Sequence, residues 1–159
     1  MVDHVFAPAV FTPAVTYRDP KAATEWLGEA FGFTLTMAIE GPAGQAAASH
    51  FEMAAPSGGR IMIGGQWAEW TRSPDEIGGV TTQSVHVHLA DGVDEHCEHA
   101  RRSGARIVAE PADQFFGDRT YRAVDLEGHV WTFATTVRAV SRADAEAIIG
   151  IPIFATDWD

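Results

Sequence analysis

Two stretches of this chain follow the same pattern at a fixed separation, and this repeat limits the folds open to the sequence. Asp19 and Asp91 each precede a stretch with helical apolar periodicity, and Gly32 and Gly104 each follow one. The two aspartates are 72 positions apart, and so are the two glycines. Self-similarity at a fixed period is typical of duplicated structural units. The sequence therefore predicts two copies of one motif in tandem.

Each copy is predicted to contain a strand, a helix and three further strands. In the first copy Asp19 supplies an N-cap, Pro20 the first helical position and Gly32 the end of the helix. Short β-rich runs bounded by Gly and Pro turns indicate the strands. In the first copy they cover 9–18, 33–40, 47–54 and 60–64, and in the second 82–89, 106–110, 119–124 and 130–136.

The domain organisation follows from these elements. We expect an α+β fold with two tandem β-α-β-β-β modules, residues 9–64 and 82–137, joined by a connection over 65–81. A short capped helix and an apolar tail occupy 138–159. A chain of 159 residues with 46% hydrophobic content buries enough surface to fold without a disulfide or a structural metal.

Charge and cysteine content narrow the range of partners. Lys and Arg total 11 against 22 for Asp and Glu, which gives a net charge of −11 that repels nucleic acid and anionic membranes. No apolar run approaches the length of a membrane helix, and the start lacks a signal-peptide pattern. Cys97, the single cysteine, cannot form an intramolecular disulfide. We expect a cytoplasmic protein whose partner is a small molecule.

Two local signatures point to a known family. The first helix ends in Phe31-Gly32-Phe33, and Gly117-Asp118-Arg119 is followed by Asp-Leu-Glu-Gly-His-Val-Trp over 125–131. Together with the duplication, these residues resemble the vicinal oxygen chelate superfamily, which includes glyoxalase I, bleomycin-resistance proteins and extradiol dioxygenases. The resemblance covers about residues 9–137. It implies a single domain in which both modules form a cupped mixed sheet around a small ligand, and it suggests a homodimer.

The resemblance also places the metal ligands of this family. Metal-using members take them from the first and last strands of each module, which correspond here to Thr12, Ser84, Met62 and Thr132. None of the four carries an imidazole or a carboxylate. A divalent cation needs about three hard or borderline donors. We therefore predict that the chain holds no metal and no cofactor, and that these four residues contact a ligand instead.

Two histidines are the strongest candidates for ligand contact. His86 and His88 lie two residues apart on a predicted strand and share a face with Ser84. The resemblance turns this face toward the cavity, where an imidazole can donate, accept or transfer a proton. Two alternatives remain open. Both rings could be structural, bonded to neighbouring strands or water, or both could serve a displaced metal site.

The remaining histidines have weaker cases. His96 and His99 are one helical turn apart, but Cys97 lies on the apolar stripe between them, so a solvated helix face accounts for this tract. We assign no role to the histidines at positions 4, 50 and 129.

Aromatic residues in two predicted long connections could clamp a flat or apolar ligand. These residues are Trp67, Trp70, Phe115 and Phe116. They could equally pack in the core or at a subunit interface. Of the four, Trp67 joins the predicted ligand-binding set.

The sequence thus favours a glyoxalase- and bleomycin-resistance-like protein that binds a small, partly apolar organic molecule in its cupped sheet without metal. One alternative is a metal-dependent lyase or isomerase of the glyoxalase type with unusual ligands. Another is a metal-free enzyme that uses His86 or His88 as a base. The sequence leaves open whether any reaction is catalysed. It contains no serine-hydrolase elbow, phosphate-binding loop or dinucleotide motif.

Overall fold

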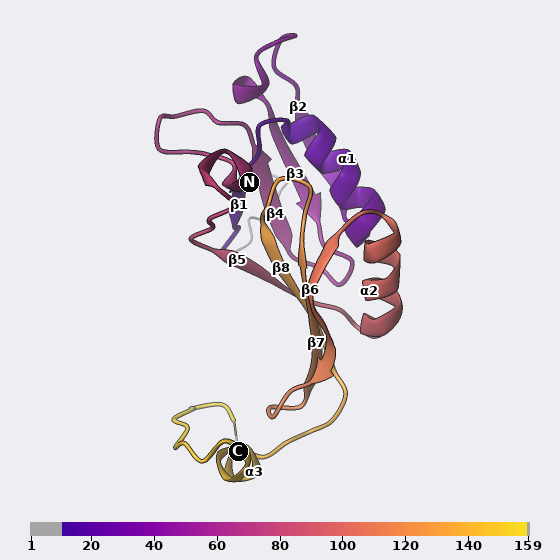
Figure 1. The fold of residues 1–159 in the computed structure, drawn as a ribbon, viewed down its shortest axis with the longest axis vertical. Helices are drawn as coiled ribbons and strands as arrows, with labels where there is room; N and C mark the ends of the chain where they lie inside the picture. The colour runs from indigo at the N-terminus through magenta and orange to yellow at the C-terminus, as the bar shows by residue number, and fades with distance from the viewer. Residues whose placement is uncertain (1–10, 159) are drawn as a thin grey trace, which may run out of the picture. The chain divides into compact units, whose positions relative to one another are not determined.

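In the computed structural model, which describes residues 11–158, the chain forms two compact units, each built on a four-stranded mixed sheet (Figure 1). Unit 1 comprises residues 11–82 together with the turn Leu126–His129. Unit 2 comprises 83–125 and 130–158. The helices and mixed sheets confirm the predicted α+β class.

Unit 1 contains one α-helix on one face of its sheet. The sheet has the order β1-β4-β3-β2, in which β1 runs parallel to β4 and the other pairs are antiparallel. Helix α1 contacts β2, β3 and β4 (Figure 1). The elements are β1 (Ala14–Thr16), α1 (Pro20–Phe31), β2 (Thr34–Ile39), the 3-10 turn η1 (Ala46–Ala48), β3 (His50–Ala54), β4 (Arg60–Gly64) and the 3-10 turn η2 (Pro74–Ile77).

The caps of α1 are those predicted from the sequence. The Asp19 carboxylate accepts a hydrogen bond from the Ala22 amide at 3.0 Å, and Pro20 occupies the first turn. Gly32 ends the helix with a φ of 71°, a left-handed conformation that glycine adopts without steric cost. The buried face of α1 packs on alternate residues of the sheet, which are Val15, Phe51, Met53, Ile61 and Ile63.

Unit 2 repeats this arrangement with its own helix. Its sheet has the order β5-β8-β7-β6, again with one parallel pair, β5 and β8. Helix α2 contacts β6, β7 and β8. The elements are β5 (Ser84–His88), α2 (Val93–Arg102), β6 (Arg106–Asp113), β7 (Asp118–Val124), β8 (Val130–Thr136) and α3 (Arg142–Ile149).

Strand pairing follows the same register in both units. Ala14 of β1 pairs with Met62 of β4, and His86 of β5 pairs with Thr132 of β8. Ala14 and His86 are 72 positions apart, as the helix-flanking residues are, whereas Met62 and Thr132 are 70 apart. The two missing residues therefore fall outside the paired strands, so each position on one sheet has a defined counterpart on the other.

Several local predictions need correction. Strand β3 begins at His50 rather than at position 47, because Ala46–Ala48 form a 3-10 turn. Gly92, not Asp91, is the N-cap of α2, and no side chain caps that end. Strand β1 covers only Ala14–Thr16 of the predicted range 9–18, and residues 9 and 10 lie outside the described part of the chain.

Strand β6 is longer than predicted and ends at Asp113. Its pairing with β7 shifts register between Ala109 and Ala112, so the strand passes Pro111 at an irregularity. As a consequence Phe115 and Phe116 lie in a tight turn before β7, not in a long connection.

No helix formed by residues 11–158 is both long enough and apolar enough to cross a membrane.

Candidate functional site

Each sheet has one face that carries its helix and one that does not; we call the second the open face. On unit 1 the buried residues of β1, β3 and β4 alternate with half-buried or exposed ones, as expected for a sheet covered on one side. The open face of unit 1 carries Ala14, Thr16, His50, Glu52, Met62 and Gly64.

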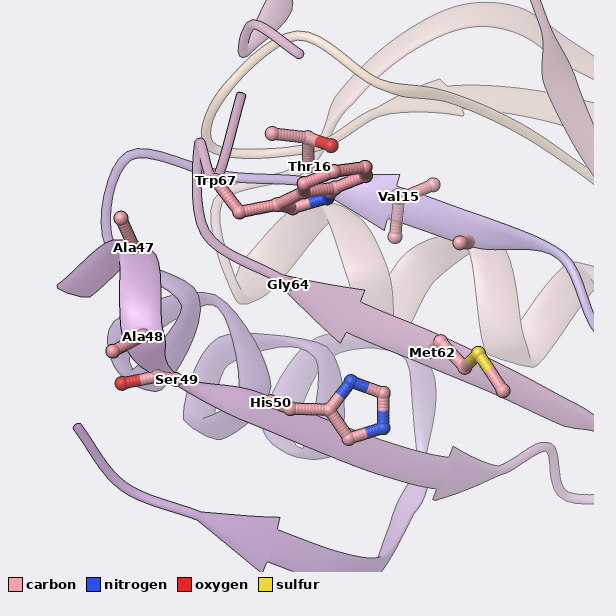
Figure 2. A pocket seen from close by; sticks show the side chains of 10 residues that line it. Val15, Thr16, Ala47, Ala48, Ser49, His50, Met62, Gly64 and Trp67 are labelled. Atoms are coloured by element: carbon pink, nitrogen blue, oxygen red, sulfur yellow. The ribbon is translucent and has the colours of Figure 1, made fainter.

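A pocket of about 390 Å³ lies on the open face of unit 1. Its lining is mostly apolar, with hydroxyl groups and one imidazole among small side chains. The lining residues are Ala14, Val15, Thr16, Ala47, Ala48, Ser49, His50, Met62, Gly64 and Trp67. In Figure 2 the His50 and Met62 side chains extend from β3 and β4, and the Trp67 indole lies beside Thr16 and Val15 of β1.

Trp67 is the largest side chain of the pocket and is largely open to solvent. It is 64% exposed, and its neighbour Trp70 is 79% exposed. The two indoles contact each other edge to face, with ring centres 5.7 Å apart. Because Trp67 borders an apolar recess while its ring stays exposed, a ligand in the pocket would cover apolar area that water now contacts.

The wall formed by η1 depends on a glycine. A Cβ at Gly65 would collide with the carbonyl oxygen of Ala46. The end of η1 is held as well, because the Gly41 amide donates a hydrogen bond to Ser49 Oγ at 3.0 Å. Close approach of the backbone at Gly65 therefore brings Ala47 and Ala48 to the pocket.

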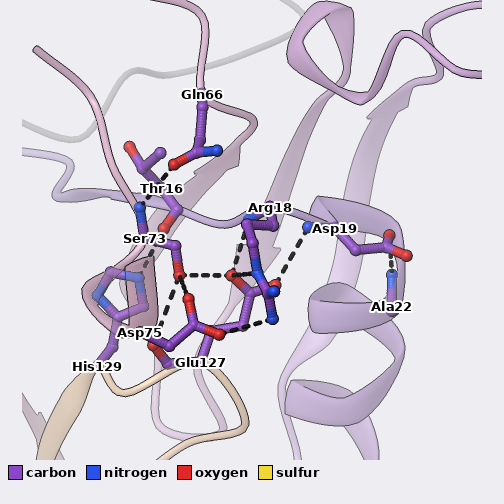
Figure 3. Close-up of polar contacts among 9 residues, drawn as sticks. All are labelled: Thr16, Arg18, Asp19, Ala22, Gln66, Ser73, Asp75, Glu127 and His129. Carbon is purple, nitrogen blue, oxygen red and sulfur yellow. Dashed lines mark hydrogen bonds and ion pairs between the residues drawn. The ribbon is translucent and has the colours of Figure 1, made fainter. Parts of the chain in front are cut away.

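The connection that carries Trp67 is anchored by a buried carboxylate, that of Glu127 (Figure 3). Glu127 is 4% exposed and accepts hydrogen bonds from the Arg18 amide at 2.7 Å and the Asp19 amide at 3.1 Å. It also accepts from Ser73 Oγ at 2.5 Å. These donors satisfy the carboxylate, so its position is that of a structural anchor rather than of a general base.

Side chains around Glu127 extend the anchor. The Arg18 guanidinium lies 2.6 Å from Asp75 and 3.8 Å from Glu127, and the Ser73 amide donates to Gln66 Oε1 at 3.0 Å. His129, from the same turn as Glu127, bonds the Thr16 carbonyl through Nε2 at 2.8 Å. The first half of the connection and the end of β1 are thereby held to the turn that carries Glu127 (Figure 3).

The open face of unit 2 carries polar side chains at positions where that of unit 1 has Ala14 and Met62. Ser84, His86 and His88 alternate with the partly or fully buried Val85 and Val87, as the sequence predicts. His88 Nε2 lies 3.1 Å from Thr136 Oγ1 and 3.7 Å from Asp118 Oδ2.

Next to these histidines, Thr132 pairs with His86 and receives a hydrogen bond from Arg122 Nε at 3.3 Å.

The predicted ligand residues therefore fall into two groups. Met62 and Trp67 line the pocket of unit 1, whereas Ser84, His86, His88 and Thr132 lie on the open face of unit 2. Thr12 is half-buried and is not among the residues that line the pocket. Ligand contact by all seven stays a prediction.

Three histidines are engaged differently from expectation. His50 lines the pocket, although the sequence assigned it no role. Its alternation with the apolar Phe51 and Met53 on a predicted strand is the sequence signal that could have placed it on the open face. His129 is buried rather than free, and Tyr17 packs against its ring.

His96 is the third, since it is not on a purely solvated face. It bonds the Tyr121 hydroxyl at 2.7 Å and packs on Phe133. Burial raises the pKa of the Tyr121 phenol far above its usual range, so the group stays neutral. Burial likewise raises the pKa of the Cys97 thiol, which disfavours a catalytic thiolate there.

The four residues that the sequence comparison with the family predicts at its metal positions are poor ligands for a metal ion. They offer hydroxyls from Thr12, Ser84 and Thr132 and a thioether from Met62, which do not fit a divalent cation that prefers carboxylate or imidazole. Within residues 11–158 no three His, Cys, Asp or Glu side chains are grouped closely enough to hold a metal.

Comparison with family models gives one match. The model described as Glyoxalase/Bleomycin resistance protein/Dioxygenase superfamily matches residues 2–133. Among curated proteins, the uncharacterized protein Rv0887c of Mycobacterium tuberculosis is 33% identical over 86 residues, 54% of this chain and 47% of that protein. The chain thus spans about half the length of the curated relatives it matches.

Two solved structures illustrate the shared fold. TioX from Micromonospora sp. ML1 is 31% identical, with a TM-score of 0.62 over 82% of this chain and 100% of that chain. TnmS3, an antibiotic binding protein from Streptomyces sp. CB03234, is 16% identical, with a TM-score of 0.63 over 84% of this chain and 99% of that one. The second likeness shows a shared fold alone.

Proposed function

Since this chain belongs to the Glyoxalase/Bleomycin resistance protein/Dioxygenase superfamily, we propose that it binds a small, partly apolar organic molecule and needs no metal ion to do so. The observation that carries this proposal is the pocket of unit 1 beside the exposed indole of Trp67. A volume of about 390 Å³ is within the range of small-molecule sites.

The chemistry of the pocket lining supports an apolar ligand with a few polar groups. Met62 supplies a flexible thioether that adapts to irregular apolar shapes. Hydroxyls of Thr16 and Ser49 and the His50 imidazole lie at its margins, where they can orient a carbonyl or hydroxyl group. Alanines at positions 14, 47 and 48 and a glycine at position 64 leave room for a flat molecule.

Trp67 is proposed to close over this ligand. A tryptophan buries a large apolar surface and has few rotatable bonds, so it gains contact area at small conformational cost. The buried anchor at Glu127 supports the role, because it limits the freedom of the connection that carries the indole. The proposal thus rests on a partly preorganised aromatic wall.

One further observation supports independence from metal, and another is in keeping with a binding role. The hydroxyls and thioether at the family's metal positions are poor ligands for a divalent cation. In addition, TnmS3, which shares the fold, is described as an antibiotic binding protein. We therefore favour a binding or resistance role in the cytoplasm over metal-dependent lyase or isomerase chemistry.

We further propose that modules 9–64 and 82–137 act as one domain and that the chain is a homodimer. Ile151 is 62% exposed and Phe154 is 91% exposed in the C-terminal tail, where a two-fold contact could cover them. Light scattering at micromolar concentration tests this association, and a monomer mass there would contradict it.

A second candidate function is metal-free base catalysis by His88. The favouring observation is its contact with Thr136 and Asp118, in which Thr136 Oγ1 also donates to Asp118 Oδ1 at 2.7 Å. A carboxylate that faces an imidazole can hold the ring in one orientation, as a general base requires. This role would require turnover that disappears with His88→Gln.

The primary proposal can be tested with the neutral fluorescent probe N-phenyl-1-naphthylamine. We expect Trp67→Ala to weaken probe binding about tenfold, since an indole contributes more than 1 kcal/mol of apolar contact. Phe154→Ala is the matched control, because it removes an exposed aromatic ring that does not line the pocket. A metal chelator in the buffer should leave the probe affinity of the parent and of both variants unchanged.

Equal binding by parent and Trp67→Ala would refute the pocket assignment. Loss of probe binding in chelator that added zinc or manganese restores would refute metal independence.

A further inference from the structure

Three residues form one row across the open face of unit 2. Thr132 of β8 pairs with His86 of β5 on one side and with Arg122 of β7 on the other. Paired residues on neighbouring strands point to the same face, and strands lie about 4.8 Å apart. An imidazole, a hydroxyl and a guanidinium are therefore placed side by side within about 10 Å.

All three groups can donate hydrogen bonds toward the same ligand. Arg122 uses Nε to bond Thr132 Oγ1 at 3.3 Å, which leaves its terminal N–H groups for another acceptor. The Thr132 hydroxyl accepts that bond, so its own hydrogen remains to donate. His86 is exposed and supplies a ring N–H from the other side.

The charge on this row is not neutralised by the protein. Within residues 11–158, Arg122 forms no ion pair. Its neighbour on β6 is Ala109, and Asp118 lies four residues away along β7, in contact with His88 and Thr136. A chain with a net charge of −11 thus keeps an uncompensated cation on an open sheet face.

Unit 1 provides an internal comparison for this row. The positions that correspond to His86, Thr132 and Arg122 by register hold Ala14, Met62 and Glu52. There the charged residue is an acid, and it is paired, since Glu52 lies 3.5 Å from Arg60. At these backbone positions unit 1 carries two apolar residues and an acid that is paired with an arginine. Unit 2 carries three hydrogen-bond donors at the same positions.

We infer that His86, Thr132 and Arg122 form an oxyanion-binding row on unit 2, which takes an organic acid group such as a carboxylate. A guanidinium and two further donors match the lone pairs of a carboxylate, and charge-assisted bonds of this kind are the stronger ones. This inference goes beyond the proposed function, because it assigns a ligand class to the open face of unit 2 and not to the pocket of unit 1. Arg122 is the residue it adds to the predicted site.

The test compares an acid with its neutral amide. Binding of benzoate and benzamide to isotope-labelled protein is followed by amide chemical shifts, with inorganic phosphate as a third probe for free anions. We expect benzoate to shift residues 86, 122 and 132 and to bind about tenfold more tightly than benzamide. Arg122→Gln should remove that difference, and Arg102→Gln, an exposed arginine on α2 with the same change in charge, should keep it.

The probes also separate the two sources of an anion. Benzoate binding without competition by phosphate supports an organic acid as the ligand, whereas stronger binding of phosphate that is lost in Arg122→Gln would overturn the organic-acid part. Equal affinities for benzoate and benzamide, or an unchanged benzoate affinity in Arg122→Gln, would overturn the row itself.

Failure here differs from failure of the proposed function. Suppose that Trp67→Ala weakens binding of the neutral naphthylamine probe while Arg122→Gln leaves the benzoate affinity unchanged. The pocket of unit 1 is then retained and the oxyanion-binding row is rejected. The opposite pattern would retain the row and remove the pocket.

Discussion

The open faces of the two sheets share a backbone register and differ in almost every side chain. Where unit 1 places Ala14, Thr16 and Met62, unit 2 places His86, His88 and Thr132. The unit 1 face carries a pocket with an aromatic wall, and the unit 2 face presents two imidazoles and a guanidinium that forms no ion pair with residues 11–158. Duplication has preserved the core and the pairing, while the open faces have separated into an apolar half and a donor-rich half.

The difference extends to the support behind each face. The connection in unit 1 is held by the Glu127 carboxylate, whose counterpart 70 positions earlier is Ser57. Unit 2 presents its polar residues directly from strands β5, β7 and β8. An aromatic wall on a loop needs an anchor, whereas groups on strands are fixed by the sheet itself.

Removal of the Glu127 charge should have the largest effect of these changes, because it removes the anchor that only the unit 1 face requires. We expect Glu127→Gln to lower the free energy of unfolding by about 2–3 kcal/mol, since hydrogen bonds to a buried charged group are worth that much. Urea denaturation measures the change. Glu98→Gln is the control, because the Glu98 side chain is 56% exposed and its pair with Arg101 should contribute less than about 0.5 kcal/mol. Equal midpoints for both variants would show that Glu127 is no anchor.

A smaller loss is expected from Gly65→Ala. The new methyl group would meet the Ala46 carbonyl and push η1 away from the pocket, at a cost of about 1–3 kcal/mol. Gly64→Ala is the matched variant, because nothing lies within 4 Å of its Cβ position and Ala134 already occupies the corresponding place in unit 2. Calorimetry should show a lower Tm for Gly65→Ala alone, and a shared shift would contradict the assigned close approach.

Exchange of one register position should make the unit 1 face resemble that of unit 2. We expect Met62→Thr to weaken binding of the neutral naphthylamine probe by about five- to tenfold, because the lost contact corresponds to one or two methylene groups. Met62 is half-buried and threonine suits a strand, so the Tm should change little. If the probe binds Met62→Thr as it binds the parent, the apolar character of this face does not determine affinity.

His88→Ala is expected to have the smallest effect on stability. The His88 side chain is 53% exposed, and its contacts with Thr136 and Asp118 are accessible to water, so the loss should stay below about 0.5 kcal/mol. Binding of benzoate should weaken in the same variant if the ring faces the ligand. Unfolding of His88→Ala would mark the ring as structural, and unchanged binding would remove it from the site.

Period and spacing were sufficient to predict two similar units, each with a helix and four strands. The offset of 72 between Asp19 and Asp91 predicted two similar units, and alternation on β5 placed His86 and His88 on one face. These features depend on local geometry, because the spacing of apolar residues along the chain reflects the helix or strand they form.

The site was harder to predict because it depends on contacts between distant segments. Glu127 lies in the recognised signature, yet nothing in its neighbours shows that it accepts from the Arg18 amide, 109 residues away. Arg122 was not predicted as a site residue either, because its proposed role depends on which residues pair with it on β8 and β6. His50 was passed over for the same reason, because η1 and Trp67 reach its side of the pocket from separate loops.

The turn Leu126–His129 belongs to unit 1, although it is encoded within the segment that builds unit 2. During synthesis the first sheet and α1 leave the ribosome long before Glu127, so the Arg18 and Asp19 amides stay without their acceptor until the β7–β8 hairpin is made. Closing a loop of more than 100 residues is also a slow, entropically costly step. Unit 1 therefore gains its last contacts only after its duplicate has been translated through β7 and the turn that follows.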